Sequence, residues 1–271
     1  MKKKVLRMQD AVSLVKEGQL LGIGGNSLYR NPSAFCFELA KRGLKGLKLC
    51  GTSHGIASDV LCAVDSVEAV YFGFFGFEIE YGLAPGMRKG CQEGKIRAME
   101  GSCPAIAAAL RGGAAGVPFV PVSGMSGSQL IAQSPEMFQI MESPFGREKI
   151  VVIKSLAPDW AIIHVHEADE FGNARIDGSL FVDPLHARAA KKTILTAEKI
   201  VSTKTFTDNP KLTSIPHFLV EAVVEAPGGA KPGCCYGLYD TADPAGMKKY
   251  QQAVKDGVLT DFLHDAATTG A

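Results

Sequence analysis

The stretch LLGIGGNSLYRNPSAF, from Leu20 to Phe35, joins an apolar run to a helical pattern through two glycines and a short polar loop. A buried strand that leads directly into a helix is a building unit of sheets with flanking helices. Glycine lets other groups approach the backbone closely, and main-chain N–H groups at a strand end can hold a negative group. The stretch therefore predicts a fold class and raises the question of which anion Gly24 and Gly25 face.

Strand and helix patterns alternate over the rest of the chain. Apolar residues recur at helical spacing in 8–15, and an N-cap with a following proline starts a helix at 102–104, which Gly112 and Gly113 are expected to end. Strands are expected at 19–25, 47–52, 69–75, 117–122, 149–154, 160–166, 193–196 and 217–225, and further helices at 33–42 and from Asp183. This alternation predicts an α/β fold with a single-domain, open, mostly parallel sheet and flanking helices.

The chain shows no internal boundary. No linker or change of composition divides residues 1–271, so we expect one domain with a peripheral helical segment from about residue 243. The prolines in VPFVPV, Val117 to Val122, place that strand at a sheet edge or a strand end. The following loop SGMSGS lies at a strand end, where ligands bind in open α/β sheets, so Ser123, Gly124 and Ser126 are candidate substrate-binding residues.

Composition excludes several classes of protein. The chain has 271 residues, 46% of them hydrophobic, which is enough for a sizeable core. A net charge of +1 gives no basic surface for nucleic acid, and no apolar run reaches the roughly 20 residues that span a membrane. The seven cysteines are scattered without a C-x-x-C pair, as is typical of a reducing compartment. We therefore expect a cytoplasmic protein.

Common catalytic motifs are absent from the sequence. It contains no dinucleotide fingerprint, no phosphate loop and no G-x-S-x-G nucleophile elbow. His164 and His166, with Glu167 and Asp169 close behind, could hold a metal, but spacing fixes no further ligand, so we favour histidines packed beside a turn and expect no metal. The pair Cys234 and Cys235 could form a redox device, although buried thiols are more common.

Several blocks in a fixed order nevertheless resemble a known family. They are EGQLLGIGG (Glu17 to Gly25), RGGAAGVPFVPV (Arg111 to Val122), SPFGREKIVV (Ser143 to Val152), ADEFGNAR (Ala168 to Arg175), VEAVVEAPGGAKP (ending at Pro232) and CYGLYD (Cys235 to Asp240). Together they resemble the α-type subunit of family I coenzyme A transferases, and within that family the glutaconate CoA-transferase type. The resemblance covers about residues 10 to 240.

The resemblance implies an activity, a partner and a site. Such enzymes move coenzyme A between carboxylic acids, here a glutaconate-like dicarboxylic or hydroxy acid, and need no cofactor. Their glutamate nucleophile lies in an S-E-N-G setting on a β-type subunit, whereas this chain lacks that sequence. The resemblance places Gly24, Gly25 and Asn26 at the substrate, with the main-chain N–H groups of Gly25 and Asn26 holding a carboxylate or an oxyanion. Asn26 stands where many relatives carry phenylalanine.

A second enzymatic hypothesis involves an acidic residue of this chain. Among Glu78, Glu80 and Glu100, the last lies just ahead of a helix N-terminus, where an anion is favoured. One branch of the family hydrolyses or ring-cleaves CoA thioesters of steroid-derived acids without the usual glutamate, and there Glu100 would act as the base. On the local pattern alone, the sequence favours an ordinary acid near a helix start for Glu100. A noncatalytic binding protein on the same scaffold is the third hypothesis.

Overall fold

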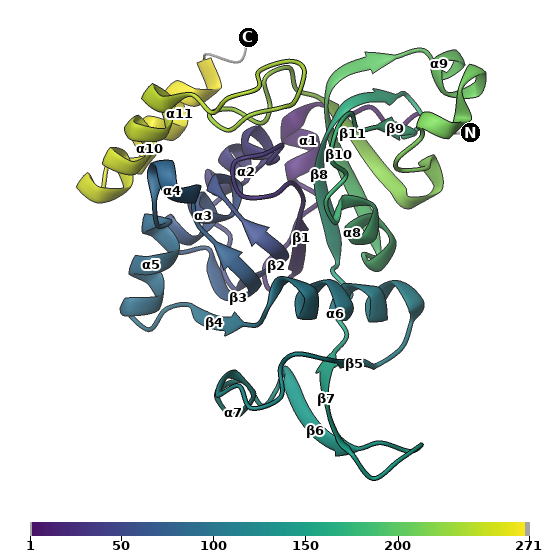
Figure 1. The fold of residues 1–271 in the computed structure, drawn as a ribbon. Coiled ribbons are helices and arrows are strands. Elements are labelled where there is room, and N and C mark those ends of the chain that lie inside the picture. The colour runs from purple at the N-terminus through teal and green to yellow at the C-terminus, as the bar shows by residue number, and fades with distance from the viewer. Residues whose placement is uncertain (1, 269–271) are drawn as a thin grey trace.

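The computed structural model describes the backbone of residues 2–268 and the side chains of residues 2–264 (Figure 1). Its main sheet has eight strands in the order β11-β10-β8-β1-β2-β3-β4, with β9 attached to β8. All neighbours along this order are parallel, and only β9 runs antiparallel. The strands are β1 (Leu20–Ile23), β2 (Leu47–His54), β3 (Val67–Phe75), β4 (Arg97–Glu100), β8 (Trp160–Asp169), β9 (Ala174–Arg175), β10 (Lys192–Val201) and β11 (Val220–Glu225). The predicted α/β class with a mostly parallel sheet is confirmed.

Helices cover both faces of this sheet. Alternate side chains of a strand point to opposite faces, so Leu21 packs in a core with Phe35 of α2 and Val60 of α3, while Cys50 packs on the other face against α6. The helices are α1 (Met8–Val12), α2 (Ser33–Ala40), α3 (Ile56–Ala63), α4 (Glu78–Tyr81), α5 (Pro85–Gln92), α6 (Cys103–Ala115), α7 (Leu130–Gln133), α8 (Asp183–Ala189), α9 (Thr203–Asp208), α10 (Pro244–Asp256) and α11 (Leu259–Thr268), with short 3-10 turns η1 (Pro210–Leu212) and η2 (His217–Leu219). Within residues 2–268, no helix has the length and apolar character needed to cross a membrane.

A small second sheet projects beyond α6 (Figure 1). It consists of β5 (Phe119–Val122), β7 (Lys149–Lys154) and β6 (Phe138–Glu142) in the antiparallel order β5-β7-β6. The strands expected at 117–122 and 149–154 are therefore present, but they do not belong to the main parallel sheet. β5 lies at an edge, as its prolines predicted.

The two glycines of α6 pack closely rather than end the helix. α6 continues through Gly112 and Gly113 to Ala115, and Gly116 forms the left-handed C-cap. A Cβ atom on Gly113 would lie 2.0 Å from the carbonyl oxygen of Leu156, which follows β7. The expected helix end at Gly112 is thus wrong, because these glycines instead let α6 approach the chain that returns from the small sheet.

The C-terminal helices begin as expected and contribute side chains to the core. The Asp243 side chain accepts a hydrogen bond from the Ala245 N–H at the start of α10. Met247 and Tyr250 of α10 are fully buried in the core that also contains α2 and α3. The Tyr250 hydroxyl donates to the buried carboxylate of Asp59 at 2.7 Å. Apolar side chains at helical spacing face the core here, so α10 completes one face of the molecule.

Candidate functional site at the carboxyl end of β1

Ligands of open parallel sheets bind beyond the carboxyl ends of the strands, and the chain after β1 is unusual there. Three residues within six positions have positive φ angles, namely Gly25 at 81°, Ser27 at 50° and Arg30 at 53°. For residues other than glycine this conformation is uncommon and costs free energy, so surrounding contacts must enforce it.

Asp183, the first residue of α8, provides much of that enforcement. Its Oδ1 accepts the main-chain N–H of Gly25 at 2.8 Å, and its Oδ2 pairs with the guanidinium of Arg30. Arg30 also donates to the carbonyl oxygens of His164 at 3.0 Å and Ser179 at 3.1 Å. Both charged side chains are almost completely buried. The negative group that the Gly25 N–H meets is therefore a carboxylate of this chain.

This arrangement changes the roles expected for the strand-end glycines. The N–H of Gly24 donates to Ile162 at 2.9 Å, and that of Asn26 donates to Tyr29 at 2.9 Å. Together with the bond from Gly25 to Asp183, these contacts occupy all three main-chain donors. The expectation that the N–H groups of Gly25 and Asn26 are free for a substrate oxygen is not met in this structure.

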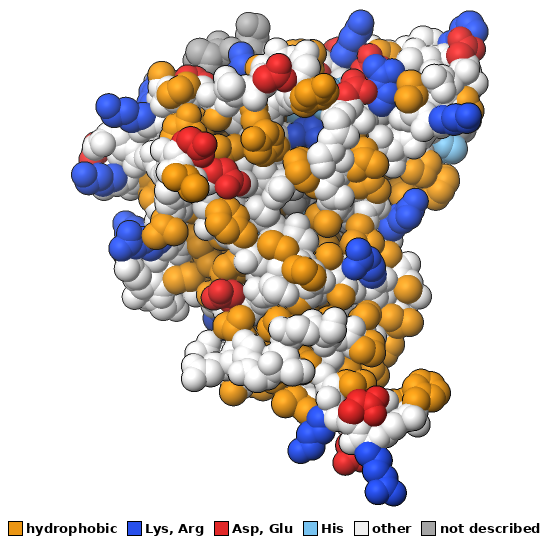
Figure 2. Space-filling view, viewed as in Figure 1, with side chains coloured by type: hydrophobic (Ala, Val, Ile, Leu, Met, Phe, Trp, Pro, Cys, Tyr) orange, Lys and Arg blue, Asp and Glu red, His pale blue; other side chains and the backbone are white. Residues whose placement is uncertain are grey.

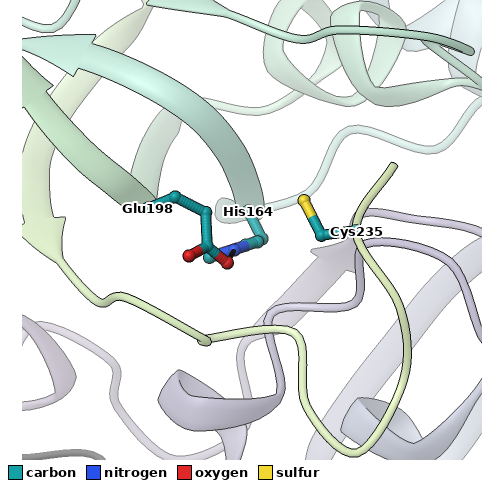
Figure 3. Close-up of side chains that lie close together, drawn as sticks. All are labelled: His164, Glu198 and Cys235. Atoms are coloured by element: carbon teal, nitrogen blue, oxygen red, sulfur yellow. Dashed lines mark hydrogen bonds and ion pairs between the residues drawn. The ribbon is translucent and has the colours of Figure 1, made fainter. Parts of the chain in front are cut away.

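A second buried polar network adjoins the first through His164 (Figure 3). The His164 Nε2 atom lies 2.8 Å from Oε1 of Glu198, and Nδ1 lies 2.8 Å from the hydroxyl of Thr196. Because a carboxylate only accepts, Nε2 carries the proton and the threonine hydroxyl donates to Nδ1. Glu198 also accepts from the Tyr239 hydroxyl and from the Gly228 N–H. Burial lowers the pKa of His164 despite the nearby carboxylate, which favours the neutral imidazole.

This network also contains a possible metal-ligand set. Ligand atoms of His164, Glu198 and Cys235 lie within 4.8 Å of one another. Burial, with the charge of Glu198 adding to it, raises the pKa of the Cys235 thiol to about 12, whereas a metal would need the thiolate. Both oxygens of Glu198 already accept hydrogen bonds from protein groups. The arrangement fits a hydrogen-bonded network better than a metal centre, and the expectation of no metal stays a prediction.

His166 and Asp169, which the sequence suggested as metal ligands beside His164, have hydrogen-bond partners in the protein. His166 lies 3.1 Å from the Asp177 N–H through Nδ1 and 2.9 Å from the Tyr236 carbonyl through Nε2. Asp169 accepts the N–H groups of Phe171 and Asn173, both at 2.9 Å. Both histidines are buried and hydrogen-bonded to protein groups, as the interpretation of packed histidines expects.

The remaining candidate residues lie apart from the β1 turn. Ser123, Gly124 and Ser126 are exposed and follow β5 in the small sheet, so the structure does not bring them together with Gly24, Gly25 and Asn26. Glu100 is the exposed last residue of β4, two residues before Ser102, the N-cap of α6. It shares the carboxyl edge with β1, but β2 and β3 intervene, which corresponds to roughly 14 Å at ordinary strand spacing. Glu78 and Glu80 are exposed on α4.

Sequence reasoning misses Arg30 and the role of Asp183. The two residues are separated by 153 positions, so no local spacing links them. The sequence pattern marks Asp183 only as the start of a helix. The positive φ angle of Arg30 leaves no signature in an ordinary side chain.

The comparisons with known proteins agree with this geometry. The family model for coenzyme A transferase matches residues 5–226, so the chain belongs to the coenzyme A transferase family. It is 32% identical to the A-type subunit of glutaconate CoA-transferase of Acidaminococcus fermentans over 93% of this chain and 83% of that one. The crystal structure of glutaconate coenzyme A-transferase from that organism superposes with a TM-score of 0.90, at 32% identity, over 97% of this chain and 88% of the other. The predicted resemblance to an α-type subunit is confirmed.

Two further relatives bear on length and activity. A protein of Archaeoglobus fulgidus is 38% identical over 84% of this chain, which spans only 51% of that relative's length. The cholesterol ring-cleaving hydrolase IpdA subunit of Mycobacterium tuberculosis is 29% identical over 82% of this chain and 79% of its own length.

Proposed function

We propose that this chain is the α-type subunit of a heteromeric CoA-transferase that moves coenzyme A between carboxylic acids, one of them a glutaconate-like dicarboxylic or hydroxy acid. The observation that carries the proposal is the likeness to glutaconate CoA-transferase, which extends over 97% of the chain at a TM-score of 0.90. The seven free cysteines suit a reducing, cytoplasmic setting.

The proposed reaction needs a carboxylate nucleophile on the partner. Its glutamate attacks the thioester carbonyl of an acyl-CoA, and the CoA thiolate leaves as an acyl–glutamyl anhydride forms. The thiolate then attacks the glutamyl carbonyl, which releases the donor acid and leaves a glutamyl-CoA thioester. The acceptor carboxylate runs these steps in reverse and departs as the new acyl-CoA. Coenzyme A is a substrate here, and no cofactor takes part.

The surface at the carboxyl edge supports a protein partner there. Ile79 is 99% exposed and Leu83 65% exposed beyond β3, while Tyr236 and Leu238, beyond β11, are 66% and 57% exposed. Figure 2 shows hydrophobic side chains over α4 and the ends of β3 and β4. Large exposed apolar side chains that gather on one edge are typical of protein interaction sites. We propose that a β-type subunit covers this edge and brings its glutamate to it.

Reconstitution tests the transferase proposal. The chain is purified alone and together with a β-type subunit that carries the S-E-N-G sequence, and CoA exchange is measured between an acyl-CoA and glutaconate or related acids. We expect exchange only with both chains present, and expect it to disappear when the partner's glutamate is replaced by alanine. Robust exchange by the single chain would contradict the proposed division of labour.

The runner-up is a subunit of a CoA-thioester hydrolase or ring-cleaving hydrolase of steroid-derived acyl-CoA, with Glu100 as the base. Two observations favour keeping it, namely the exposed position of Glu100 at the carboxyl edge and the 29% identity to the IpdA subunit. Without any acceptor acid, release of free CoA distinguishes thioester hydrolysis from transfer, and opening of the ring with the thioester intact distinguishes ring cleavage from transfer.

A further inference from the structure

The turn after β1 has its own hydrogen-bonding groups almost fully occupied. Every main-chain N–H from Gly24 to Ser27 has an acceptor in the chain, and the Ser27 hydroxyl donates to Gly76 at 3.1 Å. The acceptors of the four N–H groups are Ile162, Asp183, Tyr29 and Ser53 in chain order. Between Gly24 and Ser27 the main chain therefore has no donor left for a ligand.

The side-chain amide of Asn26 is the exception. Within the described part of the chain it is the one polar side-chain group of 24–27 without a hydrogen-bond partner. Asn26 is only half-buried, and its amide is not among the polar atoms that are closed off from solvent. An amide offers two N–H donors and an acceptor oxygen. A ligand at the end of β1 can therefore reach this group.

The backbone that carries Asn26 is held rigidly on several sides. Asn26 and Tyr29 exchange two main-chain hydrogen bonds, at 2.8 and 2.9 Å. Asp183 holds the preceding residue, Gly25, and pairs with Arg30, whose guanidinium lies 5.6 Å from the ring centre of Phe181. Phe181 itself has a φ angle of 47°, so the strain extends to the segment facing the turn. A binding group fixed in this way loses little entropy when a ligand arrives.

We propose that the Asn26 side-chain amide donates to a carboxyl or carbonyl oxygen of the acyl group, and that Asp183 is a positioning residue that holds Asn26 in place through Gly25 and Arg30. This inference rests on the proposed function and names the group that would recognise the acyl oxygen. The side-chain amide of Asn26 thus takes the role first expected of the main-chain N–H groups of Gly25 and Asn26, which are occupied.

Substitution of Asn26 tests the proposed hydrogen bond from its side chain to the acyl group. In the assembled two-chain enzyme, Asn26→Ala is expected to lower kcat/KM by about tenfold, the value of one lost hydrogen bond to substrate. Asn26→Asp should lower it further for dicarboxylic acids, because the new charge repels a carboxylate. Asn209→Ala, an exposed asparagine between α9 and η1, is the matched control and should stay within twofold of the parent. An Asn26→Ala enzyme within twofold of the parent would overturn the inference.

A double-mutant cycle tests the proposed positioning role of Asp183. If Asp183 acts through Asn26, Asp183→Asn and Asn26→Ala each lower kcat/KM by about tenfold, and the double variant is lowered about tenfold rather than about a hundredfold. Additive losses would overturn the positioning role. A purely structural carboxylate has no reason to be coupled to Asn26 in this manner.

Hydrogen exchange supplies a readout that needs no activity. Asp183→Asn should speed amide exchange of residues 24–30, and unchanged exchange there would count against the positioning role. The matched control is Asp159→Asn at the other end of β1, where Asp159 accepts the Leu20 N–H at 2.9 Å and pairs with Lys191 at 2.8 Å. A parent complex without acyl-CoA activity would contradict the proposed function, whereas an active parent with an indifferent Asn26→Ala variant would contradict this inference alone.

Discussion

At the scale of single residues, Gly25 occupies a position that excludes any side chain. A Cβ atom there would lie 2.5 Å from the carbonyl oxygen of Tyr29 and 2.7 Å from that of Arg30, in addition to the cost of its positive φ. We expect Gly25→Ala to lower the free energy of unfolding by about 2–4 kcal/mol, measured by urea denaturation.

A comparison with Gly18 separates the cost of the close contacts from the cost of the positive φ angle. Its φ angle of 73° is similar, but a Cβ atom there would meet nothing within 4 Å. Gly18→Ala should therefore cost only about 1 kcal/mol, from the backbone conformation alone. Equal losses in the two variants would show that the close contacts at Gly25 relax without cost.

Asp59 gives a prediction about pH. Burial raises its pKa to about 6, although the N–H groups of Met87 and Gly86 and the Tyr250 hydroxyl oppose this. Between about pH 4 and 6 the folded state keeps a proton that the unfolded chain has released, so this group's contribution to stability falls as pH rises through that window. Above it the penalty is constant, at up to about 3 kcal/mol.

The variant Asp59→Asn does not titrate, so it isolates this effect. The difference in unfolding free energy, variant minus parent, should rise between pH 4 and pH 7, as measured by denaturant titration at several pH values. A difference that is flat with pH would mean that Asp59 ionises in the folded protein as readily as in the unfolded one.

At the scale of elements, α10 and α11 illustrate how a surface helix can be essential to a core. Tyr250 packs against Phe77 and Phe262, with ring centres 6.1 and 5.5 Å apart, and bonds to Asp59. We expect a chain truncated before Asp243 to lose cooperative thermal unfolding. Removal of α10 and α11 exposes this apolar surface and leaves Asp59 with fewer hydrogen-bond partners. A sharp melting transition in circular dichroism after truncation would contradict this expectation.

The helices and strands also show which parts of the fold the sequence predicts and which it does not. Apolar runs and caps locate most strands of the main sheet and the starts of α2, α6 and α10. KIVVIK, residues 149–154, is recognisable as a strand, but its apolar run is compatible with either sheet and does not specify a partner. FQIME, residues 138–142, escapes prediction because its side chains are mostly exposed and its pattern is weak. Strand partners depend on contacts between distant segments.

At the scale of the whole molecule, the site is assembled from segments that the sequence separates widely. The resemblance predicts the glycines after β1 at the site, and the structure places them in a strained turn at the carboxyl edge of the sheet. The carboxylate that accepts the Gly25 N–H comes from α8, and the guanidinium that pairs with it comes from the turn itself. Only the folded arrangement shows that the main-chain N–H groups of Gly24 to Ser27 are occupied while the side-chain amide of Asn26 has no partner among residues 2–264 of the chain.

Substitution of Glu100 tests which of the two chains supplies the catalytic carboxylate. If the partner supplies the nucleophile, Glu100→Gln in the assembled enzyme should change turnover by roughly tenfold or less, because the amide keeps the size of the side chain and removes one charge. If Glu100 is instead the general base of a hydrolase, the same change removes the proton acceptor and should lower turnover by about 10² to 10⁴. Glu142→Gln, an exposed acid at the end of β6, is the matched control for loss of a surface charge.

The measurement is the turnover number with an acyl-CoA, with and without an acceptor acid. Since Glu100 lies about three strand spacings from the β1 turn, we expect the smaller effect, and we expect CoA release to depend on the acceptor. A loss of a hundredfold or more in acceptor-independent CoA release, with Glu142→Gln unaffected, would make this chain the catalytic one and the transferase proposal wrong. The two hypotheses therefore predict losses of different size for one residue, in an assay that needs only the assembled complex, one thioester and one acceptor acid.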